Sequence, residues 1–339
     1  MDKLWLGFVV GHVALFAVFV FGAARIRNRS RWLLVKKLSL LGSALVLLSL
    51  TFEIVFSFFV TQSTGQGFVL VSQRWWQRYW KPLNSHGYRD KEITAGDVDG
   101  KKVLWVVGDS FVAGQGINRA EDRFSNILQR DLGQDWVVVN IAKCGWNTGQ
   151  ELDAMRQYPH KPHAIVLSYL VNDIDGVAEN LGVLSNAAFQ PTRVEKLLQH
   201  SYYLNYLYYR FFRFRSAVDS YLDYLKRCYD SGEVWQAHQQ ELVAVAAEAR
   251  KLEAPLIVLL FPIPQDVEGS RPHLDKVAAV MTEHGAATLD VAKLLAGRSP
   301  RDMIVNAMDG HPNEAVNRDV ADALLPMIKG LRLSTARLD

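Results

Sequence analysis

Two long apolar segments near the N-terminus constrain this chain most. Leu4–Ala23 carries no charged residue, and Leu38–Val60 carries only Glu53. Each segment is long enough to cross a lipid bilayer, which takes about 20 apolar residues. The sequence therefore predicts a transmembrane hairpin over residues 1–60, with helices over about 4–23 and 38–60. A cleaved signal peptide and a buried hairpin inside a soluble protein are the two alternatives.

The loop between these segments is strongly basic, and basic residues beside membrane spans favour the cytoplasm. Both outer ends of the hairpin then face away from the cytoplasm. We therefore expect a multi-pass protein of the cell (inner) membrane whose larger part faces the periplasm or the cell exterior. The loop cations are Arg25, Arg27, Arg29, Arg31, Lys36 and Lys37.

Glu53 is unusual because an intramembrane carboxylate is costly and often functional. It lies toward the outer end of its segment, so a functional or partner-binding role and simple contact with the membrane interface both stay open.

The charge balance argues against a nucleic-acid partner. Seven of the 38 basic residues lie in the hairpin, but only two of the 35 acidic residues do, so the rest of the chain is nearly neutral. The basic sequence pI of about 8.7 therefore reflects the loop and not a cationic binding surface. An oxidising compartment would permit a disulfide between Cys144 and Cys228. Free, buried thiols are the interpretation we favour.

Two aromatic regions flank or interrupt the larger part of the chain. Residues 61–100 form a connector in which Trp75, Trp76, Tyr79 and Trp80 cluster. This connector is expected to lie near the bilayer, to pack against the outer domain, or both. A second aromatic region, interleaved with arginines, lies in a helical insertion over about residues 177–235. Core packing, contact with the membrane surface and binding of an acceptor remain open for it.

Residues 101–335 alternate solidly apolar strands with helices, as a parallel sheet buried on both faces requires. The predicted fold is an α/β protein, a three-layer α/β/α sandwich with a mostly parallel five-stranded sheet. Catalytic loops should then gather at the carboxyl ends of the strands. The expected strands are Val103–Val107, Trp136–Asn140, Ala164–Ser168, Pro255–Phe261 and Ala287–Val291. The expected helices are near Asp122–Leu132, Thr148–Arg156, Gln236–Leu252, Leu274–His284 and Glu314–Lys329.

Four separated blocks carry polar residues typical of nucleophilic catalysis, and three of them directly follow expected strands. The blocks are Val107–Phe111, Asn140–Thr148, Leu170–Asp173 and Asp309–Asn313. In this order they resemble the SGNH (GDSL-type) hydrolases over about residues 100–330. Asn84–Asp90 also resembles a segment that precedes the first block in many bacterial members. The resemblance implies a flavodoxin-like sandwich with membrane anchoring added by the hairpin.

The resemblance also implies the role of each site residue. Ser110 would be the nucleophile, His311 the general base, and Asp309 the acid that orients the imidazole. The oxyanion hole would be the backbone N–H groups of Ser110 and Gly145 and the side-chain amide of Asn172. The family usually places the acid three residues before the histidine, where this chain has Met308. Asp309 lies two residues before His311, so the position of the orienting acid departs from the family pattern.

No cofactor and no metal are expected. His160 and His163 have a spacing found in some zinc sites, but the sequence offers no third ligand near them. Gly114-Gln115-Gly116 lacks the third glycine of a dinucleotide-binding fingerprint.

These observations predict a membrane-anchored extracytoplasmic serine esterase that acts through a Ser110 acyl-enzyme. Its expected partners are an acylated glycan or another ester substrate and the lipid bilayer, with acetyl as the expected acyl group. An O-acyltransferase to a glycan, served by a membrane acyl-donor protein, would use the same triad. A non-catalytic glycan-binding or scaffold protein is the alternative from a different class.

Overall fold

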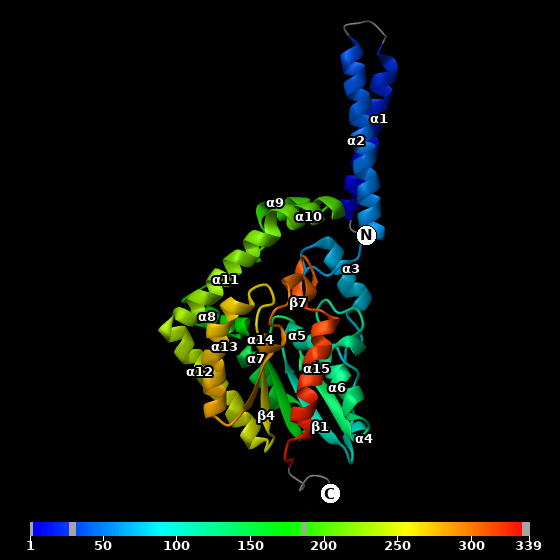
Figure 1. The fold of residues 1–339 in the computed structure, drawn as a ribbon. Coiled ribbons are helices and arrows are strands. Elements are labelled where there is room, and N and C mark those ends of the chain that lie inside the picture. Colours follow the sequence, from blue (N-terminus) through cyan, green and yellow to red (C-terminus); the bar gives the residue numbers. More distant parts are fainter. Residues whose placement is uncertain (1–2, 27–31, 185–187, 334–339) are drawn as a thin grey trace. The chain divides into compact units, whose positions relative to one another are not determined.

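The chain forms two compact units in a computed structural model, which describes residues 3–26, 32–184 and 188–333 (Figure 1). The first unit comprises Met1–Trp75 and Gln190–Ser216, and the second comprises Trp76–Phe189 and Ala217–Asp339. The helical insertion is thus divided between the two units.

Two long apolar helices dominate the first unit. They are α1 (Lys3–Arg25) and α2 (Leu33–Phe58). Their mean hydropathy of 2.3 and 2.1 suits a membrane span. Side chains such as Val18 and Phe21 are 66% exposed, which a core hairpin of a soluble protein would not allow. The pair is therefore compatible with membrane anchoring. Helix α2 begins five residues before the predicted start, and the predicted loop cations Arg27, Arg29 and Arg31 lie outside the described residues.

Shorter helices complete the first unit. They are α3 (Leu70–Tyr79), α9 (Arg193–Leu198), α10 (Tyr202–Tyr208), a π-helical turn (Tyr209–Arg213) and the start of α11 (Phe214–Asp230). Ser201 caps α10, because its hydroxyl accepts a hydrogen bond from the backbone N–H of Leu204. Helices α3 and α11 continue into the second unit.

A parallel sheet forms the centre of the second unit, and its described part has the strand order β2-β1-β3-β4-β5. The strands are β1 (Lys102–Gly108), β2 (Trp136–Ala142), β3 (Ala164–Leu170), β4 (Leu256–Phe261) and β5 (Ala287–Asp290). Gly108 is in register with Ala142 on one side and Ser168 on the other. The carboxyl ends of β2, β1 and β3 therefore lie level, so the loops that follow them meet at one edge.

Helices cover both faces of this sheet (Figure 1). Alternate residues of β1 separate the two cores, with Trp105 in one and Val106 in the other. The first core includes residues of α7 (Thr148–Gln157), α8 (Asp175–Asn180), α11, α12 (Gly232–Lys251) and α13 (Val267–Glu283). The second includes residues of α5 (Ser110–Ala113), α6 (Phe124–Leu132), α14 (Val291–Leu294) and α15 (Glu314–Lys329). This is the predicted α/β/α sandwich.

The predicted elements differ from the observed ones mainly at helix starts. Helix α13 begins at Val267, seven residues before the predicted start, because the Asp266 side chain caps it by accepting from the Gly269 N–H at 3.1 Å. A short antiparallel hairpin of β6 (Ile304–Asn306) and β7 (Asp309–Pro312) was not predicted. Three-residue strands are too short to leave a periodic pattern.

Both cysteines are free, as favoured from the sequence. Cys228 is buried on α11, whereas Cys144 is partly exposed as a whole residue although its thiol group is buried. In the connector, the Trp80 ring lies 4.9 Å from the guanidinium of Arg89. Of the two alternatives for the connector, packing against the outer domain therefore holds for Trp80.

Candidate active site

The serine of the first block begins a helix at the end of the central strand. Asp109 caps α5, and its carboxylate accepts a hydrogen bond from the Phe111 N–H at 2.9 Å. Ser110 is the first residue of that helix and is 7% exposed. A Cβ at Gly108 would lie 2.5 Å from Val112 Cγ2, so only glycine permits this tight passage from strand to helix.

The histidine and the acid of the last block lie on strand β7. His311 Nε2 is 2.9 Å from Ser110 Oγ, and His311 Nδ1 is in a short hydrogen bond with the Asp309 carboxylate. The backbone N–H of His311 also donates to Asp309 at 3.2 Å. Asp309 is fully buried, whereas the His311 side chain is 15% exposed. The structure therefore joins Ser110, His311 and Asp309 in one line of hydrogen bonds.

Strand geometry explains why an acid two positions before the histidine meets it. Residues i and i+2 of a strand point to the same face, so Asp309 and His311 share one side of β7. Met308, at the usual position of the acid, is buried and its backbone N–H donates to Asn306 Oδ1 at 2.9 Å. The offset of Asp309 is thus accommodated by the β6–β7 hairpin.

The electrostatic surroundings of His311 favour its protonated form. Burial by itself would lower the pKa of His311, but the Asp309 carboxylate, its hydrogen bond and the charge of Asp109 raise the pKa, and the net direction is upward. Burial also raises the pKa of the Cys144 thiol well above its ordinary value, so this nearby sulfur stays protonated and is a poor rival nucleophile.

A pH profile tests this balance. Only neutral imidazole can accept the Ser110 proton, so kcat/KM for ester hydrolysis is expected to rise with pH. Because the pKa of His311 is raised, the midpoint should lie above the ordinary histidine value of about 6.5. A midpoint below that value would contradict the electrostatic account.

The two other candidate oxyanion donors lie beside Ser110 through the strand order. Gly145 follows β2 and Asn172 follows β3, and these two strands flank β1. Gly145 is exposed with a φ of +78°, a conformation that favours glycine, and Asn172 lies in a 3₁₀ turn over Val171–Ile174. The topology brings both residues to the edge that holds Ser110. No hydrogen bond between either of them and Ser110 is found among the described residues.

Two buried acids, Glu151 and Asp173, lie close in sequence to the candidate oxyanion donors. Burial raises the pKa of Glu151 and of Asp173 well above the ordinary carboxyl range, and repulsion from neighbouring acids, including Asp109, raises it further. Glu151 lies on α7, which follows the Gly145 loop, and Asp173 is next to Asn172 in sequence. Both shifts favour the neutral form of these carboxyl groups.

Tyr221 is a neighbour of the site that the sequence analysis missed. It belongs to α11, and its hydroxyl accepts a hydrogen bond from the Asn172 side chain. Burial and the charge of Asp175 raise the pKa of Tyr221, and the hydrogen bond from Asn172 opposes that rise. Tyr224, one turn further, donates to the Asp175 carboxylate. The spacing of Tyr221, Tyr224 and Cys228 on one helix face was the signal available in the sequence.

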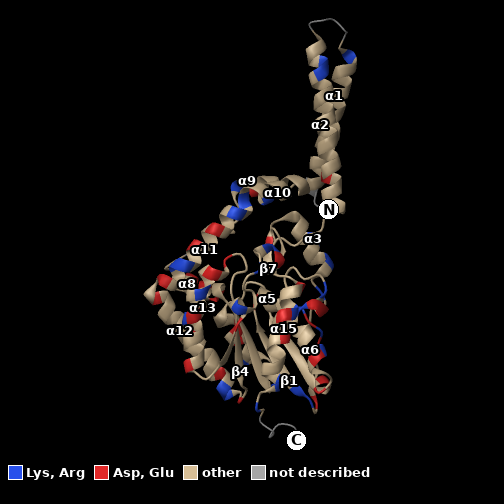
Figure 2. Ribbon diagram, viewed as in Figure 1, with Lys and Arg blue, Asp and Glu red and all other residues tan. Residues whose placement is uncertain are grey.

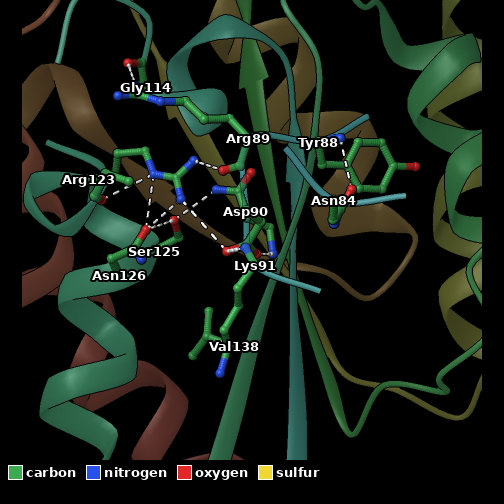
Figure 3. Close-up of polar contacts among 12 residues, drawn as sticks. Asn84, Tyr88, Arg89, Asp90, Lys91, Gly114, Arg123, Ser125, Asn126 and Val138 are labelled. Carbon is green, nitrogen blue, oxygen red and sulfur yellow. Dashed lines mark hydrogen bonds and ion pairs between the residues drawn. The ribbon is translucent and has the colours of Figure 1, made fainter. Parts of the chain in front are cut away.

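Two buried arginines, Arg89 and Arg123, bind the backbone at the end of α5 and lie beside Asp90 (Figure 3). Both Arg89 and Arg123 are inaccessible to solvent. Arg89 donates to the carbonyl oxygens of Gly114 at 2.6 Å and Ile117 at 2.8 Å. Arg123 donates to the carbonyl oxygen of Arg89 at 2.5 Å and is 3.9 Å from the Asp90 carboxylate. Burial, and then the charge of Arg123, lower the pKa of Arg89 to about 10, which leaves it charged at neutral pH.

The loop held by Arg89 also packs against Asp309. A Cβ at Gly116 would lie 3.0 Å from Asp309 Oδ2 and 2.5 Å from Val305 Cγ2, and its φ of +86° also favours glycine. Arg89 therefore acts as a positioning residue for both the end of α5 and the surroundings of Asp309. This accounts physically for the Asn84–Asp90 segment that the sequence analysis singled out.

Arg89→Ala is expected to lower the free energy of unfolding by on the order of 3 kcal/mol, because it leaves several buried carbonyl groups without their charged donor. Arg119→Ala is the matched control, since Arg119 is 74% exposed and its loss should change stability by less than about 0.5 kcal/mol. Thermal unfolding of the two variants measures the difference. Equal losses would show that Arg89 has no special structural role.

A serine, a histidine and an aspartate joined in this way at the carboxyl edge of a parallel sheet are the arrangement of serine hydrolases. Sequence comparison matches residues 106–318 to the GDSL-like lipase/acylhydrolase family, and the chain belongs to that family. The match spans all five predicted site residues, which are Ser110, Gly145, Asn172, Asp309 and His311. A comparison with curated proteins gave no match.

Solved structures similar to this chain include a lipase/acylhydrolase from Enterococcus faecalis, with 14% identity, 69% of this chain and 100% of that chain covered, and a TM-score of 0.42. Another is the esterase EstA from Pseudoalteromonas sp., with 16% identity, coverages of 68% and 100%, and a TM-score of 0.40. A third is a catalytic mutant of Axe2, an acetylxylan esterase from Geobacillus stearothermophilus, with 17% identity, coverages of 70% and 98%, and a TM-score of 0.41.

Proposed function

We propose that this chain is a membrane-anchored serine esterase that acts outside the cytoplasm on acetyl esters of an envelope or exported glycan. The observation that carries the proposal is the position of His311, whose two ring nitrogens contact Ser110 and Asp309. Residues 101–335 would form the catalytic domain, and residues 1–60 would anchor it in the membrane. Residues 61–100 would connect the two.

Acylation begins when Ser110 Oγ attacks the ester carbonyl carbon while its proton moves to His311 Nε2. Asp309 stabilises the imidazolium that forms, because its buried carboxylate is bound to Nδ1. The carbonyl oxygen becomes an oxyanion, for which the backbone N–H groups of Ser110 and Gly145 and the Asn172 amide are the proposed donors. When this intermediate collapses, the bond between the carbonyl carbon and the sugar oxygen breaks, and His311 gives its proton to that oxygen, which leaves as a hydroxyl group.

Deacylation repeats these steps with water as the nucleophile. His311 removes a proton from the water as it attacks the acetyl-serine carbonyl. The intermediate then breaks down to acetate, and the proton returns to Ser110 Oγ. A glycan hydroxyl in place of this water would make the same machinery an O-acyltransferase. The exclusion of water from the site would therefore decide between the two outcomes.

The proposed location rests on the hairpin and its loop. The two helices have the length and composition of membrane spans, and three of the four described basic residues of the hairpin lie at the loop end, namely Arg25, Lys36 and Lys37. The positive-inside rule then orients the second unit outward. Acylated glycans are among the ester substrates that an enzyme anchored there would meet.

The function is tested with the full-length chain in nanodiscs and an O-acetylated polysaccharide, with acetate release as the readout. Acetate release that is lost in Ser110→Ala supports the esterase. A second arm supplies p-nitrophenyl acetate and an unacetylated glycan, where acetylated glycan would identify a transferase instead. Glycan binding without transfer or hydrolysis in either arm would contradict both enzymatic assignments and favour a scaffold protein.

A further inference from the structure

The helical insertion exposes large apolar side chains in its first half. Beyond Phe59, five of the eight exposed large apolar residues in the described chain fall between residues 194 and 212. We call these five residues the insertion face. They are Val194 (44% exposed), Leu197 (74%), Leu207 (37%), Phe211 (69%) and Phe212 (75%). Such a concentration marks an interaction surface, because soluble domains rarely gather apolar side chains in this way.

Hydrogen bonds tie this part of the insertion to the outer end of the hairpin. The fully buried carboxylate of Glu53 accepts from Trp5 Nε1 at 2.7 Å, from Ser201 Oγ at 2.7 Å and from the Tyr202 N–H at 3.0 Å. Glu53 therefore joins α1, α2 and the start of α10. Since it lies five residues before the end of α2, it is about 7 Å from that end along the helix axis.

Further contacts fix the depth of α10 within this unit. One helical turn before Glu53 on α2, the hydroxyl oxygens of Ser49 and Tyr203 are 2.6 Å apart. The Phe56 and Tyr206 rings lie with their centroids 5.1 Å apart, and Asn205 Oδ1 accepts from the Leu70 N–H at 3.0 Å. Tyr203 and Tyr206 thus face α2, and Asn205 faces the start of α3. The ring contacts described for Phe211 and Phe212 are with neighbouring residues of the insertion, Arg210 and Tyr208, and both side chains remain largely exposed.

The same segment is basic. Residues 190–216 contain five cations and one acid, Glu195, which is buried and 3.6 Å from Arg213. The other cations are Arg193, Lys196, Arg210 and Arg215, and all four are exposed. Figure 2 shows Lys and Arg gathered where the insertion leaves α10. Exposed aromatic and aliphatic side chains interleaved with cations are the composition of helices that lie in an anionic membrane interface.

We propose that the insertion face lies in the headgroup region of an anionic phospholipid bilayer, on the side of the membrane where α2 ends. The inference rests on the proposed membrane insertion of the hairpin and adds a third contact with the bilayer. Glu53 is then a structural node that holds α10 at the interface, which explains why a carboxylate is retained near the end of a membrane helix.

Site-directed spin labelling of the full-length chain tests the proposal in nanodiscs of phosphatidylcholine with phosphatidylglycerol. Single cysteines replace Leu197 or Phe212 in a Cys144→Ala/Cys228→Ala background, and power saturation compares access by oxygen with access by a water-soluble nickel chelate. Labels at both positions are expected to favour oxygen. Lys251→Cys is the aqueous control, because its side chain is 73% exposed and it lies in the second unit, outside the 61–100 connector.

Val13→Cys separates the two proposals, since Val13 is 52% exposed in the middle of α1. If a Val13 label favours oxygen while labels at 197 and 212 match the one at 251, the insertion face is overturned and the anchor is kept. If the Val13 label also matches the one at 251, the anchor is overturned and, with it, the proposal. Omitting phosphatidylglycerol should raise nickel access at 197 and 212, and unchanged access would contradict the anionic preference.

Discussion

Ser110→Ala is expected to lower kcat for p-nitrophenyl acetate by at least about 10⁴-fold in the full-length chain, leaving only slow hydrolysis by water in the polarised site. That loss corresponds to about 5–6 kcal/mol of activation free energy. The substitution removes one hydroxyl at a position that is 7% exposed, so the fold should persist. Spectrophotometric release of p-nitrophenol measures it.

Ser85→Ala serves as the control for this experiment. Ser85 is exposed and its hydroxyl donates to Glu92 at 2.8 Å, so its loss should leave kcat unchanged. If Ser110→Ala retained more than about a tenth of the activity while remaining folded, another nucleophile would have to be responsible.

Asp309→Asn is expected to lower kcat by about 10⁴-fold, the loss that the same change produces in a serine protease triad. The amide cannot stabilise the imidazolium, and its NH₂ group can hold His311 in the wrong tautomer. Because the Asp309 carboxylate raises the pKa of His311, the midpoint of the remaining pH profile should also move to lower pH. Kinetics across a pH series measures both effects.

Asp302→Asn is the matched control, because Asp302 is exposed in the turn before β6. It should change neither kcat nor the pH midpoint. An Asp309→Asn variant with full activity would mean that another group orients His311, and would leave the short contact between Asp309 and His311 without a catalytic role.

The sheet could be predicted from the sequence because its strands are apolar on both faces. The runs around Val106, Val139 and Ile257 have no polar alternation, which is the signature of parallel strands between two helix layers. The strand order then follows from right-handed crossovers and places the loops after β2 and β3 beside Ser110. This is why Gly145 and Asn172 could be proposed without a structure.

The supporting elements could not be predicted, because their partners are backbone groups far away in sequence. Nothing in the sequence shows that Arg89 binds the carbonyl oxygens of Gly114 and Ile117. The orientation of Asp309 depends on a hairpin of three- and four-residue strands, which leaves no periodic signal. The bonds from Ser201 and Tyr202 to Glu53 span almost 150 residues and required the three-dimensional structure.

Trapping of the covalent intermediate tests the central claim most directly. The full-length chain is mixed with p-nitrophenyl acetate, quenched in acid within the first turnover, and examined by intact mass and peptide mapping. The account predicts one acetyl group on Ser110 in the unaltered chain and none in Ser110→Ala. Turnover accompanied by an acetyl group on any other residue, or an adduct that survives Ser110→Ala, would contradict it.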